Sequence, residues 1–153
     1  MADKKGITPI MATVLLLSFA VAIGVVVMNF GRAQVEEDAE CPVDIGLKLA
    51  EIGGQKQLCY NAGNKQVKFT IENGVNTEVK GIIVNIIGAQ EAKSSDIPSA
   101  TMIKLGNYLG NVNYDSGVSG DIKQVKITPK VVLYDKEQIC VDQALVVEDI
   151  KGC

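Results

Sequence analysis

The feature that most constrains this chain is an uncharged stretch near its amino terminus, ITPIMATVLLLSFAVAIGVVVMNF, from Ile7 to Phe30. As an α-helix rising about 1.5 Å per residue, these 24 residues would cover about 36 Å, against about 30 Å for the bilayer hydrocarbon core. A helix also satisfies its own backbone hydrogen bonds, which lipid cannot do. The stretch therefore predicts a membrane-spanning helix that begins immediately after Gly6, with Thr8 as N-cap and Pro9 in the first turn.

The charges on either side of this stretch predict its orientation. Lys4 and Lys5 precede it. One base, Arg32, follows it together with four acids, which are Glu36, Glu37, Asp38 and Glu40. Because lysine and arginine are enriched on the cytoplasmic side of membrane spans, we expect the amino terminus inside and the rest of the chain outside.

Composition narrows the functions that the chain can have. The 15 basic residues are scattered among 18 acidic ones and aromatic residues are only 5%, so we predict no nucleic-acid partner. Histidine, the usual proton-transfer group near neutral pH, is absent. Asp115-Ser116-Gly117 resembles one arm of an aspartic protease, but that chemistry needs two such carboxylates and no second copy occurs. We expect no enzyme activity, no catalytic residue, no metal site and no cofactor.

Two interpretations of the apolar stretch follow from the residues alone. It could be a permanent anchor, which would make the protein an uncleaved, single-span extracellular binding module. It could also be a secretory signal cut after the Ala20-Val21-Ala22 triplet, but that cut would leave eight apolar residues, Ile23 to Phe30, on the mature protein.

A third interpretation comes from a resemblance. The residues KKG followed by ITPIMATVLLL, from Lys4 to Leu17, resemble the class III signal peptide and amino-terminal helix of archaeal type IV pilins. The resemblance covers about residues 1–35. It implies a leader of residues 1–6 and cleavage between Gly6 and Ile7, so that Lys4, Lys5 and Gly6 direct processing and Ile7 becomes the mature terminus.

The pilin resemblance also implies partners and a location. A membrane prepilin peptidase would cut the leader, and a cytoplasmic assembly ATPase with a membrane platform protein would extrude the subunits. The precursor would lie in the cytoplasmic membrane and the mature chain in an extracellular helical homopolymer. Insertion and polymerisation would use the apolar side chains of the helix, which are Pro9, Leu15, Leu16, Leu17, Phe19, Val21, Ile23, Val26, Val27 and Phe30.

The chain departs from the bacterial pilin pattern at Met11, the fifth mature position, where bacterial pilins carry a glutamate. Archaeal members commonly lack that acid, so the departure favours the archaeal branch. A minor pilin or pseudopilin, which primes assembly or secretion, would share the same processing. Adhesion, DNA uptake, motility and scaffolding all stay open as roles of the filament.

After residue 40 the apolar residues alternate in short segments, which is typical of strands. These segments predict strands at residues 44–52, 65–74, 78–88, 121–134 and 143–150. We expect residues 89–112 to form mainly a loop around Ser94, Ser95 and Pro98, with a short strand or helix at 101–109.

The predicted fold class is therefore α+β, with one core in the head. Its parts are the leader (1–6), a long hydrophobic helix and stalk (7–40), and an antiparallel, immunoglobulin-like β-sandwich head (41–153). Helix and stalk are expected to reach about Ala39, before Pro42.

Four cysteines, Cys41, Cys59, Cys140 and Cys153, all follow the span and so lie in the compartment predicted to be extracellular. Their even number predicts two disulfides. Zinc is the alternative, but no C-x-x-C pair occurs.

The spacing of the cysteines disfavours the two disulfides that would close short loops, Cys41 with Cys59 and Cys140 with Cys153. Cys140 and Cys153 flank a predicted strand whose eight extended residues would span about 26 Å, whereas a disulfide needs Cα atoms within about 7 Å. A hairpin at residues 53 and 54 leaves Cys59 only partway back to Cys41. In a sandwich with parallel first and last strands we prefer Cys41 with Cys140 and Cys59 with Cys153. Cys41 with Cys153 and Cys59 with Cys140 is the alternative.

Overall fold

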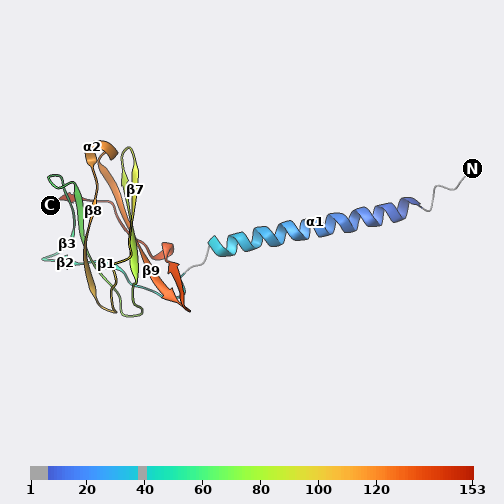
Figure 1. The fold of residues 1–153 in the computed structure, drawn as a ribbon, viewed down its shortest axis with the longest axis horizontal. Coiled ribbons are helices and arrows are strands. Elements are labelled where there is room, and N and C mark those ends of the chain that lie inside the picture. Colours follow the sequence, from blue (N-terminus) through green and yellow to red (C-terminus); the bar gives the residue numbers. More distant parts are fainter. Residues whose placement is uncertain (1–6, 38–40) are drawn as a thin grey trace, which may run out of the picture. The chain divides into compact units, whose positions relative to one another are not determined.

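The structure is a computed structural model that describes residues 7–37 and 41–153. The chain divides into two compact units, with the boundary between Ala39 and Glu40, and each unit is described by itself (Figure 1). The first unit contains one long helix and the second contains the strands. The α+β class with a β-rich head is therefore confirmed.

The first unit contains α1 (Ile7–Glu37), a helix of 31 residues. It includes the whole apolar stretch, as predicted, and the expected end near Ala39 lies outside the described residues. Thr8 is the second residue of the helix, so the prediction that Thr8 flanks it as the N-cap is wrong. Pro9 lies in the first turn, where a missing N–H leaves no intrahelical hydrogen bond unmade.

Within residues 41–153, one five-stranded sheet is built around β5. Its strands are β1 (Lys48–Leu49), β4 (Leu58–Asn61), β5 (Gln66–Glu72), β8 (Asn107–Asn113) and β12 (Lys151–Gly152). β8 pairs with one edge of β5, and β1 and β4 pair in succession with the other edge, all antiparallel. β12 runs parallel to β4, with Lys151 opposite Cys59, so the head is not wholly antiparallel as predicted.

A second five-stranded sheet of the same residues is built around β6 and β9. Its strands are β6 (Gly81–Gly88), β7 (Ala92–Ile97), β9 (Ile122–Leu133), β10 (Lys136–Ile139) and β11 (Leu145–Val147). β6 lies between β7 and β9, and β9 pairs along its other edge with β11 and then with β10. A separate hairpin joins β2 (Glu51–Ile52) to β3 (Gln55–Lys56) through Gly53 and Gly54, both at positive φ.

The two sheets share one hydrophobic core, which makes the head a β-sandwich (Figure 1). Alternate side chains of β5, β6 and β9 point inward and are almost completely buried. They are Val67, Phe69, Ile71, Ile82, Val84, Ile86, Val125 and Ile127. Because successive side chains of a strand point to opposite faces, this alternation places one face of each strand in the core and turns the other away from it.

Residues 89–112 contain two strands, so the prediction of a loop is wrong. β7 includes Ser94 and Ser95 and pairs with β6 along its whole length. It is a polar edge strand whose exposed side chains show no apolar alternation, and backbone hydrogen bonds to β6 hold it in place. β8 occupies part of the region where we expected a short strand or helix.

Three further predicted boundaries are corrected by the structure. Residues 44–52 form two short strands, β1 and β2, rather than one. The strand predicted at 121–134 is β9, and a short helix, α2 (Ser116–Ser119), precedes it. The strand predicted at 143–150 shortens to β11, because residues 141–143 form a 3-10 turn, η1 (Val141–Gln143).

Two disulfides tie the head together. Cys41 bonds to Cys140 with a Cα separation of 5.4 Å, and Cys59 bonds to Cys153 with a Cα separation of 5.0 Å. This is the pairing that we preferred from the sequence. The parallel pair that brings Cys153 beside Cys59 is β4 with β12, rather than the first and last strands of the head.

Candidate assembly helix

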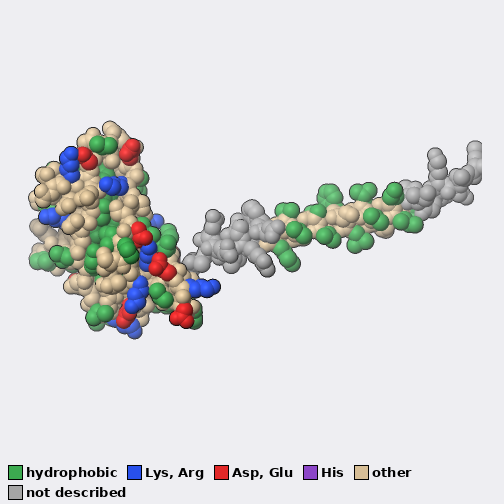
Figure 2. Space-filling view, in the orientation of Figure 1, with side chains coloured by type: hydrophobic (Ala, Val, Ile, Leu, Met, Phe, Trp, Pro, Cys, Tyr) green, Lys and Arg blue, Asp and Glu red, His purple; other side chains and the backbone are tan. Residues whose placement is uncertain are grey.

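The apolar part of α1 is long enough to cross a bilayer. From Pro9 to Met28 the helix has a mean hydropathy of 2.8 over 20 residues, and none of this segment is buried within the chain. Figure 2 shows hydrophobic side chains along both visible edges of the helix. By length and composition this helix is able to serve as a membrane anchor or as a signal.

The side chains that we predicted to drive polymerisation are exposed along this helix. Among the large ones described, the exposed fraction ranges from 52% at Ile23 to 71% at Leu16. The predicted set that the structure finds exposed is Pro9, Leu15, Leu16, Leu17, Phe19, Val21, Ile23, Val26 and Val27. Phe30 is part of α1, but its side chain lies outside the described residues.

Apolar side chains surround the helix on every side. Consecutive residues of an α-helix are about 100° apart, so the run from Val14 to Leu17 alone covers the full circumference. A helix that is apolar all round requires an apolar environment on all faces, either lipid or other protein. Water is therefore not a stable surrounding for the Pro9–Met28 segment of α1.

The two hydroxyl groups of this segment are already satisfied within the helix. Thr13 donates its hydroxyl hydrogen to the carbonyl of Ile10, and Ser18 donates to the carbonyl of Val14, each at 2.8 Å. Burying an unpaired hydroxyl in an apolar environment costs several kcal/mol. Because these hydroxyls are paired locally, the segment can move between dry environments without losing a hydrogen bond.

Small residues make part of the helix surface flat. Ser18 and Ala22, and also Ala20 and Gly24, are spaced four residues apart and so share a face in each pair. Apart from its chain neighbours and the nearby backbone of the helix itself, no atom lies within 4 Å of the place where a Cβ of Gly24 would sit. Small residues at this spacing allow another helix backbone to approach closely.

No protein-family model, curated protein or solved structure matches this chain.

The predicted leader and cleavage site are only partly described. Lys4, Lys5 and Gly6 lie outside the described residues, whereas Ile7 is the first residue of α1. The proposed scissile bond therefore directly precedes the helix.

Two groups in the head that the sequence offered as candidates for chemistry, Asp115 and the four cysteines, have structural partners. Asp115 caps α2: its carboxylate accepts a hydrogen bond from the backbone N–H of Gly117 at 2.9 Å and one from Lys65 Nζ at 2.7 Å. The hydrogen bond from Lys65 lowers the pKa of Asp115, and the N–H of Gly117 lowers it further. The alternative zinc site is not formed, because all four cysteines are joined in disulfides.

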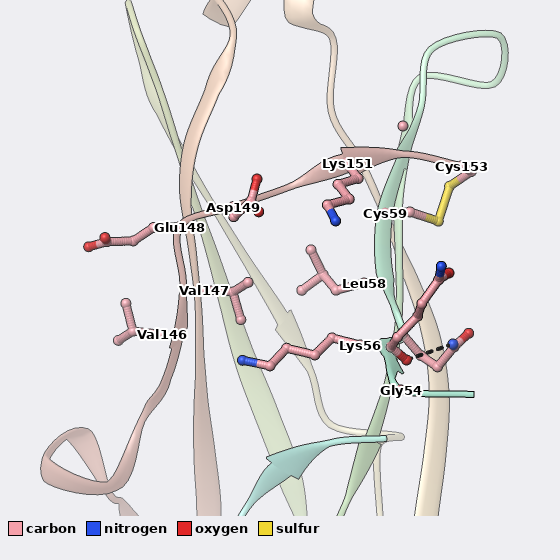
Figure 3. Close-up of a pocket in the computed structure, with 13 residues that line it drawn as sticks. Gly54, Lys56, Leu58, Cys59, Val146, Val147, Glu148, Asp149, Lys151 and Cys153 are labelled. Atoms are coloured by element: carbon pink, nitrogen blue, oxygen red, sulfur yellow. Dashed lines mark hydrogen bonds between the residues drawn. A yellow bond between two sulfur atoms is a disulfide. The ribbon is translucent and has the colours of Figure 1, made fainter. Parts of the chain in front are cut away.

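A groove of about 810 Å³ opens on one side of the head, between β3–β4 and β11–β12 (Figure 3). Leu58 and Val147 point toward one another across it. Its lining includes two lysines and two acids, which are Lys56, Lys151, Glu148 and Asp149. Charges of both signs around an apolar floor do not specify a ligand class.

One exposed feature of the head was not predicted from the sequence. Three aliphatic side chains on two neighbouring loops, Val75, Ile103 and Leu105, are 58%, 70% and 71% exposed. The apolar content of the 101–109 segment was visible in the sequence, but not that two loops would present it together.

Proposed function

We propose that this protein is the structural subunit of an archaeal type IV pilus-like filament. The observation that carries the proposal is the helix from Ile7 onward, apolar on every face and exposed throughout its described part, directly after a short basic leader that ends in Gly6. A helix of this kind needs apolar partners on all sides. Copies of the same helix can supply them.

Processing would convert a membrane precursor into an assembly-competent subunit. A prepilin peptidase would cut between Gly6 and Ile7, on the cytoplasmic side of the span. Unlike an ordinary secretory cleavage, this cut leaves the whole apolar helix on the mature protein. The retained helix holds the subunit in the membrane until assembly.

Assembly would exchange lipid for neighbouring helices. Both surroundings are apolar, so the hydrophobic effect changes little on transfer, and close packing supplies the specificity. The faces at Ser18–Ala22 and Ala20–Gly24 suit such packing, and the hydroxyls of Thr13 and Ser18 stay paired during it. A cytoplasmic ATPase acting through a membrane platform protein would drive the extraction.

The head would form the outer surface of the filament in the extracellular space. Disulfides persist in oxidising compartments, which agrees with a head exported across the membrane. With its amino terminus in the cytoplasm, the chain would place all four cysteines outside.

Replacement of Gly6 by leucine tests the proposal. Gly6→Leu blocks the small-residue cleavage position, so we expect an uncut precursor in the membrane and no filaments by negative-stain microscopy of sheared material. Asp3→Asn, a leader change away from the scissile bond, is the matched control and should give normal fibres. Normal fibres from Gly6→Leu would contradict the proposed cleavage site. An intact leader on the wild-type protein, in cells that contain the peptidase, would instead indicate a tethered binding module.

A further inference from the structure

The end-loop cluster, as it is called here, consists of three exposed aliphatic side chains on two adjoining loops at one end of the head: Val75, Ile103 and Leu105. Each of these side chains is more than half exposed, and their loops, 73–77 and 101–106, connect strands of both sheets. Single exposed aliphatic residues are common on protein surfaces, but three on adjoining loops need an explanation.

The two loops are fixed to one another by hydrogen bonds. The backbone N–H of Leu105 donates to the carbonyl of Gly74 at 2.9 Å, and that of Asn73 donates to the carbonyl of Gly106 at 2.8 Å. The side-chain amide of Asn73, a residue only 2% exposed, donates to the carbonyls of Ile103 at 3.0 Å and Thr77 at 2.8 Å. The end-loop cluster is therefore held in place rather than carried on independent loops.

Leu105 adopts an unfavourable backbone conformation. Its φ is 60°, in the left-handed region that glycine and asparagine adopt far more readily than leucine. Local stability alone would favour Gly or Asn at this position. Leu105 keeps this strained position beside two further exposed aliphatic side chains on hydrogen-bonded loops, and this combination points to a contact that the isolated head does not make.

The end-loop cluster lies at the end of the head where its polypeptide begins. The carbonyl of Ile45 accepts a hydrogen bond from the N–H of Gly74 at 3.1 Å, and the carbonyl of Asp44 accepts one from Asn76 Nδ2 at 2.9 Å. These residues follow Cys41, the first described residue of the head. Any contact made here is made close to the point where the head joins its stalk in the sequence.

The apolar circumference of α1 identifies the partner. In a bundle of α1 helices, inward faces contact other helices, but outward faces such as those of the Val14–Leu17 turn still need an apolar cover. Resting on the proposed function, we propose that the end-loop cluster packs on the outward face of α1 of a neighbouring copy in the filament. The head would thereby seal the helical bundle from water.

Asparagine substitutions in the full-length chain test this contact without damaging the fold. Leu105→Asn removes the aliphatic side chain but places at φ 60° a residue that tolerates it, so the unfolding temperature of the detergent-solubilised subunit should stay the same or rise. Leader cleavage should be normal. We expect at least tenfold fewer sheared filaments from Leu105→Asn, and a similar loss from Ile103→Asn.

Tyr134→Asn is the matched control. Tyr134 is 93% exposed and also has a positive φ, 53°, but it lies at the tip of the β9–β10 hairpin, outside the two loops that carry the end-loop cluster. This variant should form filaments at the wild-type level. Wild-type filament yield and stability from both Leu105→Asn and Ile103→Asn would overturn the inference while leaving the proposed function intact. Absence of filaments from the wild-type chain itself would overturn both.

A photo-crosslink identifies the partner surface directly. With benzoylphenylalanine in place of Ile103, irradiation of sheared filaments should give a covalent dimer whose junction peptide comes from α1. The same group at Leu109, which is 78% exposed on β8, is the control and should not yield that peptide. Adducts of position 103 with lipid, with head peptides only, or with no partner would overturn the assignment.

Discussion

Cys41 and Cys140 are 99 positions apart in the sequence, yet a disulfide holds their Cα atoms 5.4 Å apart. Gln143 reinforces this junction, because its side-chain amide donates to the carbonyl of Val43 and its amide oxygen accepts from the N–H of Ile45, each at 2.6 Å. The beginning of the head is thus fixed to the segment that follows β10. Pulling on the stalk would load this junction first.

Removal of this disulfide should destabilise the head strongly. Closing a loop of about 100 residues contributes about 5 kcal/mol in the chain-entropy estimate. We therefore expect the double variant Cys41→Ser, Cys140→Ser to lose about that free energy of unfolding. Denaturant unfolding can be followed by tyrosine fluorescence, since the chain has four tyrosines and no tryptophan. An unchanged midpoint relative to the oxidised wild type would contradict the pairing.

Gly88→Ala should disturb the core around Tyr114. A Cβ at Gly88 would collide with the Tyr114 hydroxyl and with the carbonyl of Ser119. That hydroxyl is buried and donates to the carbonyl of Gly120 at 2.7 Å, so it has little freedom to move. Overpacking of this kind costs about 1 to 3 kcal/mol.

The same unfolding measurement on Gly152→Ala provides the control for Gly88→Ala. The nearest atom to a Cβ at Gly152 is the carbonyl oxygen of Tyr60 at 4.0 Å, which is ordinary contact. Equal stability losses in both variants would show that the close approach at Gly88 is not real.

Asp115 should make stability depend on acid pH. Hydrogen bonds from Lys65 and then from the N–H of Gly117 lower its pKa below the ordinary 3.8. A lowered folded-state pKa gives stability that is present above the ordinary pKa and is lost as the pH falls through the folded-state value. Asp115→Asn keeps a helix-capping oxygen but removes the charge. We expect it to lower the unfolding temperature at pH 7, with the difference from wild type closing below pH 3.8.

Lys130 should make the stability of the head depend on pH at alkaline values. This residue is only 7% exposed, and its Nζ lies 2.7 Å from Asp96 and 3.6 Å from Glu137. The hydrogen bond to Asp96 is the main cause that raises the pKa of Lys130 above 10.5. The resulting stability is present below 10.5 and is lost as the pH rises through the folded-state value.

Lys130→Met retains the buried aliphatic stem and removes the amine. Its unfolding temperature should show a smaller decline than wild type as the pH rises beyond 10.5. Lys136→Met, at an exposed position of β10, is the control and should follow the wild-type curve. Identical alkaline profiles for Lys130→Met and wild type would contradict the role of the ion pair.

The elements that the sequence predicted well carry a strong local pattern, either an uninterrupted apolar run or periodic burial. The uncharged run gave α1, and alternation at Val67, Phe69 and Ile71 gave β5, because one face of that strand packs in the core. β7 was not predicted, because its sequence, AKSSDI, is polar and shows no apolar alternation. Backbone pairing to β6 holds it as an edge strand. Local sequence does not report the partner that such a strand will find.

Tertiary contacts also decided the remaining differences. Gln143 lies in a 3-10 turn rather than in a strand, since its side chain binds the backbone of residues 43 and 45 from the start of the head. The exposure of the end-loop cluster depends on hydrogen bonds between loops that lie about 30 positions apart in the sequence. Neither relationship leaves a periodic pattern.

The mass of the amino-terminal peptide from subunits in sheared extracellular filaments tests the central claim most directly. If the apolar helix survives maturation and supports assembly, that peptide begins at Ile7 and contains the stretch through Phe30. A peptide that begins at Met1, or secreted protein that begins after Phe30, would contradict the account.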